Sequence, residues 1–293
     1  MKMKINSMKR KVWYHVAVVF CLGLLACQSD DEKFEEASKE VVFRVVNYTQ
    51  YNLDEVTRAS ADVLDHLVLG VFDAESNAMV GSLITQDKGA DGYGTFKVKL
   101  PVGQYRLVFL GYVGSSTFNM SSPTLVTFAN DAVPTTFSYS TTLTVGHDQI
   151  EAQNIVLKRA FGAFRVTLTD VIPSGVATMR FRSVGGSTKL NGQTGYAADN
   201  SGRTFSVSIP TSYIGKEDVK LTLNLFLPEG ETKMSIALDA LDSEGTVLRT
   251  RTFTDVPMMV NRLINYSGAF FSNDCSATVT VDDEWESEPT VNF

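Results

Sequence analysis

The sequence predicts an all-β protein, most economically a pair of antiparallel β-sandwich domains. Apolar and polar residues alternate with a period of two through most of the chain, and Gly, Asn, Asp and Pro separate the alternating segments. Such alternation is typical of strands that have one face in the core and the other in water. Because no segment of comparable length has a helical period of 3.6 residues, half-buried strands are expected to form the core.

Several segments show this alternation clearly. Gly94 to Leu100 places its apolar residues on one face and Lys97 and Lys99 on the other, and a turn at residues 101–103 leads into a second strand. The pattern recurs in four later segments, Ala163–Thr169, Thr204–Ile209, Val219–Leu227 and Met234–Leu238. Two strand-turn-strand units, at residues 67–77 and 236–245, resemble each other, as expected if one such unit occurs in each domain.

The first 26 residues are typical of a bacterial lipoprotein signal peptide. Five basic residues and no acidic residue precede an apolar run, Val12–Ala26, that is too short for a comfortable membrane span. The run ends in Leu24-Leu25-Ala26 before Cys27, and lipoprotein signal peptidase requires a small residue at that place. We therefore expect cleavage after Ala26, lipidation of Cys27 and attachment to the outer membrane.

The remaining 267 residues are predicted to form a tether and two domains. Residues 28–32 are polar and acidic, and they resemble the export tag of surface lipoproteins in bacteroidete-type bacteria; a plain solvated tether is the alternative. We expect the tether to cover residues 27–39, the N-terminal sandwich residues 40–157 and the C-terminal sandwich residues 158–293. The boundary is placed where the polar stretch 146–154 gives way to a fresh strand.

The net charge excludes nucleic acid as a partner. Removal of the signal peptide leaves 21 basic and 33 acidic residues, a formal charge of −12. Binding to phosphates by charge requires clustered Lys and Arg side chains, which this chain lacks.

No catalytic or metal-binding constellation is found in the sequence. The two histidines that follow the signal peptide, His66 and His147, have no neighbours that suggest a ligand set. Acidic residues gather at 282–288, but without the spaced oxygen ligands and central Gly of a calcium loop, so a solvated strand end is the preferred interpretation. We expect no enzyme activity, no cofactor and no metal.

Several motifs, in this order, resemble the fimbrillins and the fimbrial anchor or tip subunits of bacteroidete-type bacteria. After the lipid-attachment motif come the strand 41–46, a polar stretch that ends at residues 56–60, and a strand that ends in Val71-Phe72-Asp73. The segment 100–105 is similar to the "apolar, Pro, x, Gly, x, Tyr" hairpin of that family. Three further segments resemble the opening strand of its second domain, its penultimate strand and its final strand: 157–164, 256–268 and 281–285.

The resemblance implies two tandem transthyretin-like β-sandwich domains and a role in building or anchoring adhesive fimbriae at the cell surface. In that family, cleavage after an Arg releases the first strand, and the C-terminal segment of another subunit fills the groove. Transferred to this chain, the cleavage point lies between Arg58 and Ala59. The removable strand contains Val41, Phe43 and Val45, and the donor strand contains Val279, Val281 and Trp285.

The implied partners are other fimbrial subunits, joined by strand exchange, and the outer membrane. The resemblance leaves open whether the chain is a shaft, anchor or tip subunit, and whether it binds a ligand on a host or bacterial surface. The alternative is a surface glycan-binding lipoprotein, also a β-sandwich, in which tyrosines form a platform for sugar rings. The candidates for such a platform are Tyr93, Tyr105, Tyr112 and Tyr196.

Overall fold

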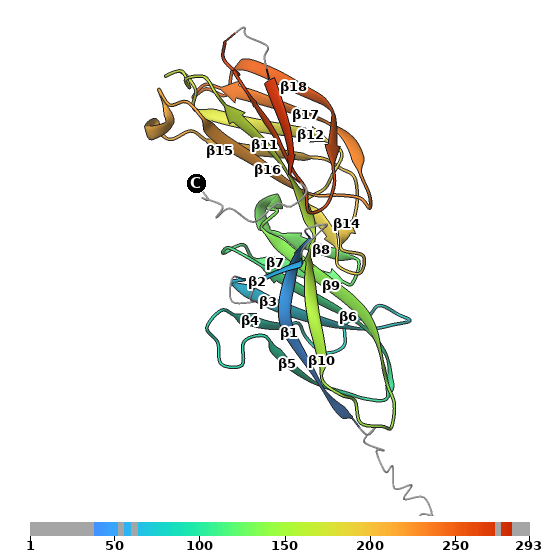
Figure 1. The fold of residues 1–293 in the computed structure, drawn as a ribbon. Helices are drawn as coiled ribbons and strands as arrows, with labels where there is room; N and C mark the ends of the chain where they lie inside the picture. Colours follow the sequence, from blue (N-terminus) through green and yellow to red (C-terminus); the bar gives the residue numbers. More distant parts are fainter. Residues whose placement is uncertain (1–37, 52–55, 60–63, 273–276, 283–293) are drawn as a thin grey trace, which may run out of the picture. The chain divides into compact units, whose positions relative to one another are not determined.

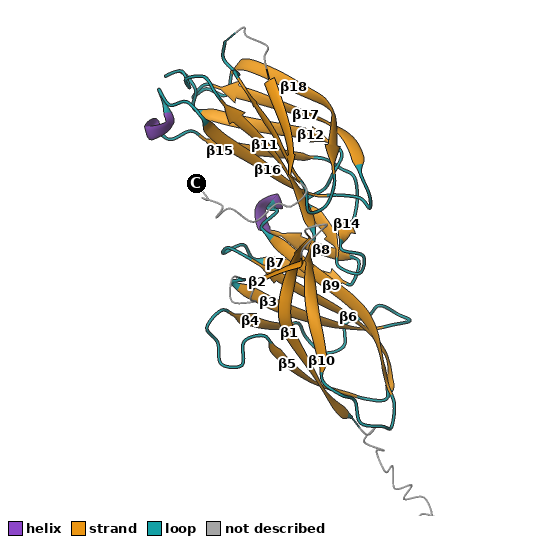
Figure 2. Ribbon diagram, in the orientation of Figure 1, coloured by secondary structure: helices purple, strands orange, loops and turns teal. Residues whose placement is uncertain are grey.

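A computed structural model of the chain describes residues 38–51, 56–59, 64–272 and 277–282. Strands dominate these residues, and their only helical elements are two short 3-10 turns, η2 (Ala129–Asp131) and η3 (Thr211–Tyr213). The all-β prediction is therefore confirmed (Figure 2). Within the described ranges, no helix has the length and apolar character needed to cross a membrane.

The first half of the described chain forms one continuous sheet in the strand order β2-β1-β10-β9-β6-β3-β4, and β5 pairs with the same edge of β1 as β2 does, nearer the start of β1 (Figure 1). The strands of this sheet are β1 (Lys39–Tyr51), β2 (Val56–Ala59), β3 (His66–Asp73), β4 (Ile84–Asp87), β5 (Thr95–Leu100), β6 (Gly103–Tyr112), β9 (Thr136–Val145) and β10 (Gln153–Arg159).

This sheet folds over on itself into two layers. β9 pairs with β6 along its whole length but meets β10 at only two residue pairs, so the sheet opens into two faces beyond that point. The buried cluster between the faces combines side chains of β1, β5 and β10 with side chains of β3, β6 and β9. Phe43 and Phe96 pack edge-on against Phe109, at ring distances of 5.4 and 6.0 Å, which joins the two layers.

The second half forms two four-stranded sheets, in the orders β16-β11-β19-β20 and β15-β12-β17-β18. Their strands are β11 (Phe161–Leu168), β12 (Thr178–Val184), β15 (Arg203–Ser208), β16 (Val219–Phe226), β17 (Thr232–Leu241), β18 (Val247–Met258), β19 (Leu263–Gly268) and β20 (Ala277–Asp282).

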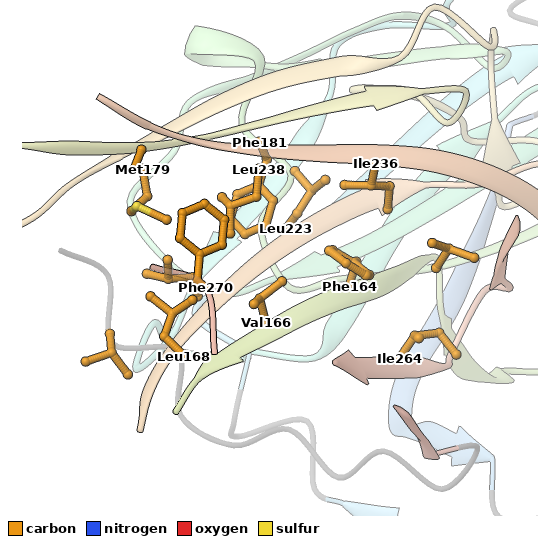
Figure 3. Close-up of a cluster of buried hydrophobic side chains, with 14 of the residues drawn as sticks. Phe164, Val166, Leu168, Met179, Phe181, Leu223, Ile236, Leu238, Ile264 and Phe270 are labelled. Atoms are coloured by element: carbon orange, nitrogen blue, oxygen red, sulfur yellow. The ribbon is translucent and has the colours of Figure 1, made fainter. Parts of the chain in front are cut away.

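The two sheets of the second half share one apolar core. Figure 3 shows side chains of both sheets in this cluster, with Phe164 of β11 close to Phe181 of β12. The alternation in the sequence explains the cluster, because residues two apart along a strand project to the same face. The predicted β-sandwich is thus present in this half, but β11 and β19 pair in parallel while the other neighbouring strands pair antiparallel. A transthyretin-like arrangement stays a prediction.

A small sheet and a third apolar cluster join the two halves. The strands of the small sheet follow the order β14-β13-β8-β7. They are β7 (Phe118–Ser122), β8 (Leu125–Phe128), β13 (Lys189–Asn191) and β14 (Tyr196–Ala197). Phe128 of β8 stacks on Phe226 of β16 at 6.3 Å. The guanidinium of Arg159 lies over the rings of Phe137 and Phe161 at 5.6 and 5.5 Å. The predicted domain boundary, after Leu157, falls inside β10 and stays a prediction.

Asp239 is a fully buried carboxylate on β17, held by three side chains of neighbouring strands. Arg180 and Arg182 of β12 donate hydrogen bonds to it at 2.8 to 3.1 Å, and the Thr250 hydroxyl of β18 donates one at 2.8 Å. The hydrogen bond from Arg182 does most to hold the pKa of Asp239 well below its usual range, against the effect of burial. The cluster therefore ties three strands of one sheet together.

We expect Asp239→Asn to lower the free energy of unfolding by about 2 to 3 kcal/mol at neutral pH, because charge-assisted hydrogen bonds are lost. A carboxylate whose pKa is lowered by folding stabilises the fold above its unfolded pKa of 3.8, and this stabilisation is lost as the pH falls below that value. Urea denaturation at several pH values should show a constant gap between the two proteins above about pH 5 and a narrowing gap below it. Asp148→Asn, at an exposed position, is the control and should leave stability unchanged.

Candidate functional site

Strand β1 occupies a place between two other strands of the first sheet. On one side it pairs in parallel with β10, from Phe43 beside Gln153 to Thr49 beside Lys158. On the other side, Lys39 to Arg44 pair antiparallel with β5, and Tyr48 to Tyr51 pair antiparallel with β2. Because both edges of β1 are paired, its removal would leave two rows of backbone groups without partners.

The alternate residues of β1 fill the core of this half. Val41 and Phe43 are completely buried and Val45 is nearly so, whereas Glu40 and Arg44 are exposed. Burial of side chains of this size stabilises a protein by about 1.5 to 3 kcal/mol each. β1 is therefore an integral core strand, although only its C-terminal end connects it to the rest of the described body.

The predicted cleavage point lies in β2. Residue 58 pairs with Thr49 and residue 59 with Tyr48 in the antiparallel ladder between β2 and β1. Arg58 and Ala59 thus belong to an extended segment beside the strand that the cut would release, and their cleavage stays a prediction.

The predicted donor strand corresponds to β20, which pairs antiparallel with β19 at the edge of its sheet, from Ala277 beside Gly268 to Asp282 beside Leu263. All six of its residues are exposed, with Val279 and Val281 at 47 and 48%. β20 therefore contributes no buried side chain to the core. Trp285 and Cys27 lie outside the described residues, so the lipid on Cys27 stays a prediction.

Side chains of neighbouring elements hold the backbone of residues 270–272, the segment that leads toward β20. The Asp170 carboxylate accepts hydrogen bonds from the backbone N–H groups of residues 270, 271 and 272, at 2.6 to 2.9 Å. Arg249 and Arg251 of β18 donate to the carbonyl of Ser272, and Arg251 also donates to that of Phe270. Phe270 is itself buried in the core. The chain is thus firmly fixed up to Ser272.

His66, which has no obvious partners in the sequence, contacts two side chains in the structure. Its Nδ1 lies 2.7 Å from an Asp87 carboxylate oxygen, and its ring stacks on Tyr112 at 4.6 Å. These residues sit side by side on β4, β3 and β6, and with Phe118 they line a depression of about 310 Å³. Burial, followed by the charge of Asp87, raises the pKa of Tyr112.

Two of the four tyrosines considered for a glycan platform, Tyr105 and Tyr112, are buried, whereas Tyr93 and Tyr196 are partly exposed. The hydroxyl of Tyr105 donates to the carbonyl of Pro101 at 2.9 Å. The hydroxyl of Tyr93 donates to the carbonyl of Leu64 at 2.6 Å. Because a stacking platform needs an exposed ring face, Tyr105 and Tyr112 have structural roles.

The ion pair between Lys189 and Asp199 stabilises the local structure of the second half. Lys189 donates a hydrogen bond to Asp199 at 2.8 Å and, with the hydroxyl of Ser187, holds the pKa of that carboxyl well below its usual range. Asp199 in turn accepts from Ser201, which fixes the turn before β15. Within the described ranges, no group of three or more His, Cys, Asp or Glu side chains is placed to hold a metal ion.

Comparison with known proteins shows which solved structures have a fold similar to that of this chain. One similar solved structure is a "putative adhesin" from Bacteroides ovatus, with a TM-score of 0.52 and 9% sequence identity. The alignment covers 85% of this chain and 95% of the chain of that protein. A second "putative adhesin" from this species has a TM-score of 0.50 and 14% sequence identity, and the alignment covers 86% of this chain and 88% of that one. The fimbrial anchor protein Mfa2 from Porphyromonas gingivalis has a TM-score of 0.49 and 12% sequence identity, and the alignment covers 84% of this chain and 98% of that one.

The two Bacteroides ovatus structures establish a shared fold, so the resemblance expected from the sequence is confirmed at that level. The chain belongs to the family of unknown function DUF6562, whose model matches residues 36–292. No curated protein matches the chain at a significant level.

We expect Phe43→Ala to lower the free energy of unfolding by about 3 to 5 kcal/mol, because it leaves a cavity beside Phe109 in the closed core. Arg44→Ala, at the next and exposed position of the same strand, is the matched control and should change stability little. Chemical denaturation of both variants measures the difference. Equal stabilities would contradict the assignment of β1 as a core strand.

Proposed function

We propose that this chain is a non-enzymatic surface lipoprotein that acts in cell adhesion as a fimbrial subunit, anchor or tip component and assembles by β-strand donation. The observation that carries the proposal is the place of β1 between β5 and β10, with alternate side chains in the core. Loss of this strand would expose an apolar trough flanked by two unpaired edges. A strand donated by another subunit would fill the apolar trough and pair with both open edges.

The C-terminal strand has a suitable pattern for such a donor. β20 alternates the apolar residues Ala277, Val279 and Val281 with two threonines, as β1 alternates Val41, Phe43 and Val45 with a half-buried Val42 and an exposed Arg44. By sequence parity, Trp285 falls on the same side as the valines if the strand continues. Because β20 buries no side chain in its own subunit, its transfer costs little core packing.

Cleavage between Arg58 and Ala59 by a trypsin-like protease is the step that we propose for release of β1. Its location in the edge strand β2 supports the assignment, because a protease binds its substrate in an extended form.

We also propose the surrounding architecture: a signal peptide at residues 1–26, a tether at 27–39 and domains at 40–157 and 158–293. The lipid on Cys27 would hold the protein in the outer membrane, and the other fimbrial subunits would be its partners. The shared fold with Bacteroides ovatus proteins described as "putative adhesins" supports the adhesive role.

Limited trypsin treatment tests the exchange. We expect a cut after Arg58, followed by loss of residues 41–58 and formation of oligomers with partner subunits, because the open trough favours a donated strand. Mass spectrometry and size-exclusion chromatography follow the two steps. Arg58→Ala removes the proposed site and should leave the chain intact and monomeric. Retention of residues 41–58 together with the absence of oligomers would contradict strand exchange.

Mass spectrometry of the protein taken from bacterial membranes tests the anchor. We expect an N-terminus at an acylated Cys27, whereas Cys27→Ala should leave the chain without a lipid and move it out of the membrane fraction. An N-terminus at Ala59 would identify a polymerising subunit instead. A wild-type N-terminus at residue 27 that carries no lipid would overturn the anchor.

A further inference from the structure

The apolar face of β20 is only half covered by the residues that the structure describes. Val279 pairs with Tyr266 and Val281 with Ile264, so the two valines project to the same side as these core residues. Ile264 is completely buried, yet the valines remain about half exposed. The other face of β20 carries Thr278, Thr280 and Asp282 and is suited to water. The core therefore continues onto β20, but the opposing layer does not.

The opposing layer ends at β18. Among the described strands, β18 pairs with β17 alone and is the last strand of its sheet. A cavity of about 290 Å³ lies between this edge and the end of β19, lined by Phe253, Tyr266, Phe270 and Ala277 among others. One more strand beside β18 would extend the layer over the valines of β20.

The direction of the chain at this edge favours one occupant. β18 ends at Met258, and a tight turn, in which the N–H of Arg262 donates to the carbonyl of Met259, leads into β19 at Leu263. β20 ends beside Leu263, at Asp282. The chain that follows Asp282 thus starts at the same end of the sandwich where β18 stops. If it turns back, it runs antiparallel along the outer edge of β18.

We propose that the C-terminal segment, residues 283–293, adds to β18 as a fifth strand of its sheet and covers the apolar face of β20. Its eleven residues can extend over about 36 Å, enough to follow the edge of β18. The segment also has the matching chemistry. Trp285, Val291 and Phe293 all stand at odd-numbered positions, so they supply apolar surface on one side of an extended strand.

This inference concerns the isolated subunit and does not rest on strand donation. If β20 is also a donor, the docked segment keeps it on its own subunit until a partner arrives. A monomer can therefore dock its tail whether or not assembly by strand exchange occurs, and the two are tested separately.

Tryptophan fluorescence provides the test, because the sequence has two tryptophans and Trp285 is the one within the compact unit that begins at Ser38. In the chain from Ser38 onward, we expect Trp285 to be quenched by acrylamide several-fold less than in urea, at every protein concentration. The double variant Val279→Glu and Val281→Glu places charges on the face to be covered and should expose Trp285. Thr278→Glu with Thr280→Glu, on the opposite face of the same strand, should not.

Hydrogen exchange gives a second readout that does not depend on these variants. Truncation after Asp282 should accelerate exchange at the β18 amides between Leu248 and Thr254 and leave those of β17 unchanged. Unchanged exchange at β18, or a fully accessible Trp285 in the monomer, would overturn the proposal. Protection of Trp285 that appears only at concentrations where a dimer forms would overturn it too, because the occupant would then be a second copy.

Discussion

The backbone pairing of β1 on both of its edges is the constraint on which the first sandwich depends. A strand in this position must satisfy β10 in parallel and β5 antiparallel, and must place an apolar residue at every second position of the trough. Phe43, packed against Phe109, is the residue that joins the two layers there. Any segment that replaced β1 would have to meet the same three conditions. The proposed mode of assembly follows from this requirement rather than from a particular side chain.

Much of the strand content could be predicted from the sequence, because period-two alternation is local information. The segments predicted at 94–100, 163–169 and 219–227 correspond to β5, β11 and β16. Burial was harder to predict. Thr167 stands at a polar position of the alternating segment 163–169, yet it is buried, and its hydroxyl donates a hydrogen bond to Asn265 of β19. The sequence shows the period of a strand, but it does not show which neighbour covers its second face.

The polar sites were hidden because they depend on register between distant strands. Asp87 lies 21 residues from His66, and Asp239 lies 57 residues from Arg182, so neither pair forms a motif. In both cases, the partners become neighbours only when the strands align across the sheet. The resemblance predicted a first strand at residues 41–46, whereas the parallel pairing of β1 with β10 has no signal in either strand alone. Arg58, placed in a polar stretch by the sequence, pairs through its backbone in β2.

The parallel register of β1 and β10 has a mechanical meaning. β10 runs through a single residue, Ala160, into β11 of the second half, while the start of β1 faces the N-terminal end of the chain. A pull on that end against the second half therefore draws the two strands in opposite directions along their length. Their hydrogen bonds are then loaded together in shear and are not opened one after another. Such an arrangement resists tension along the chain.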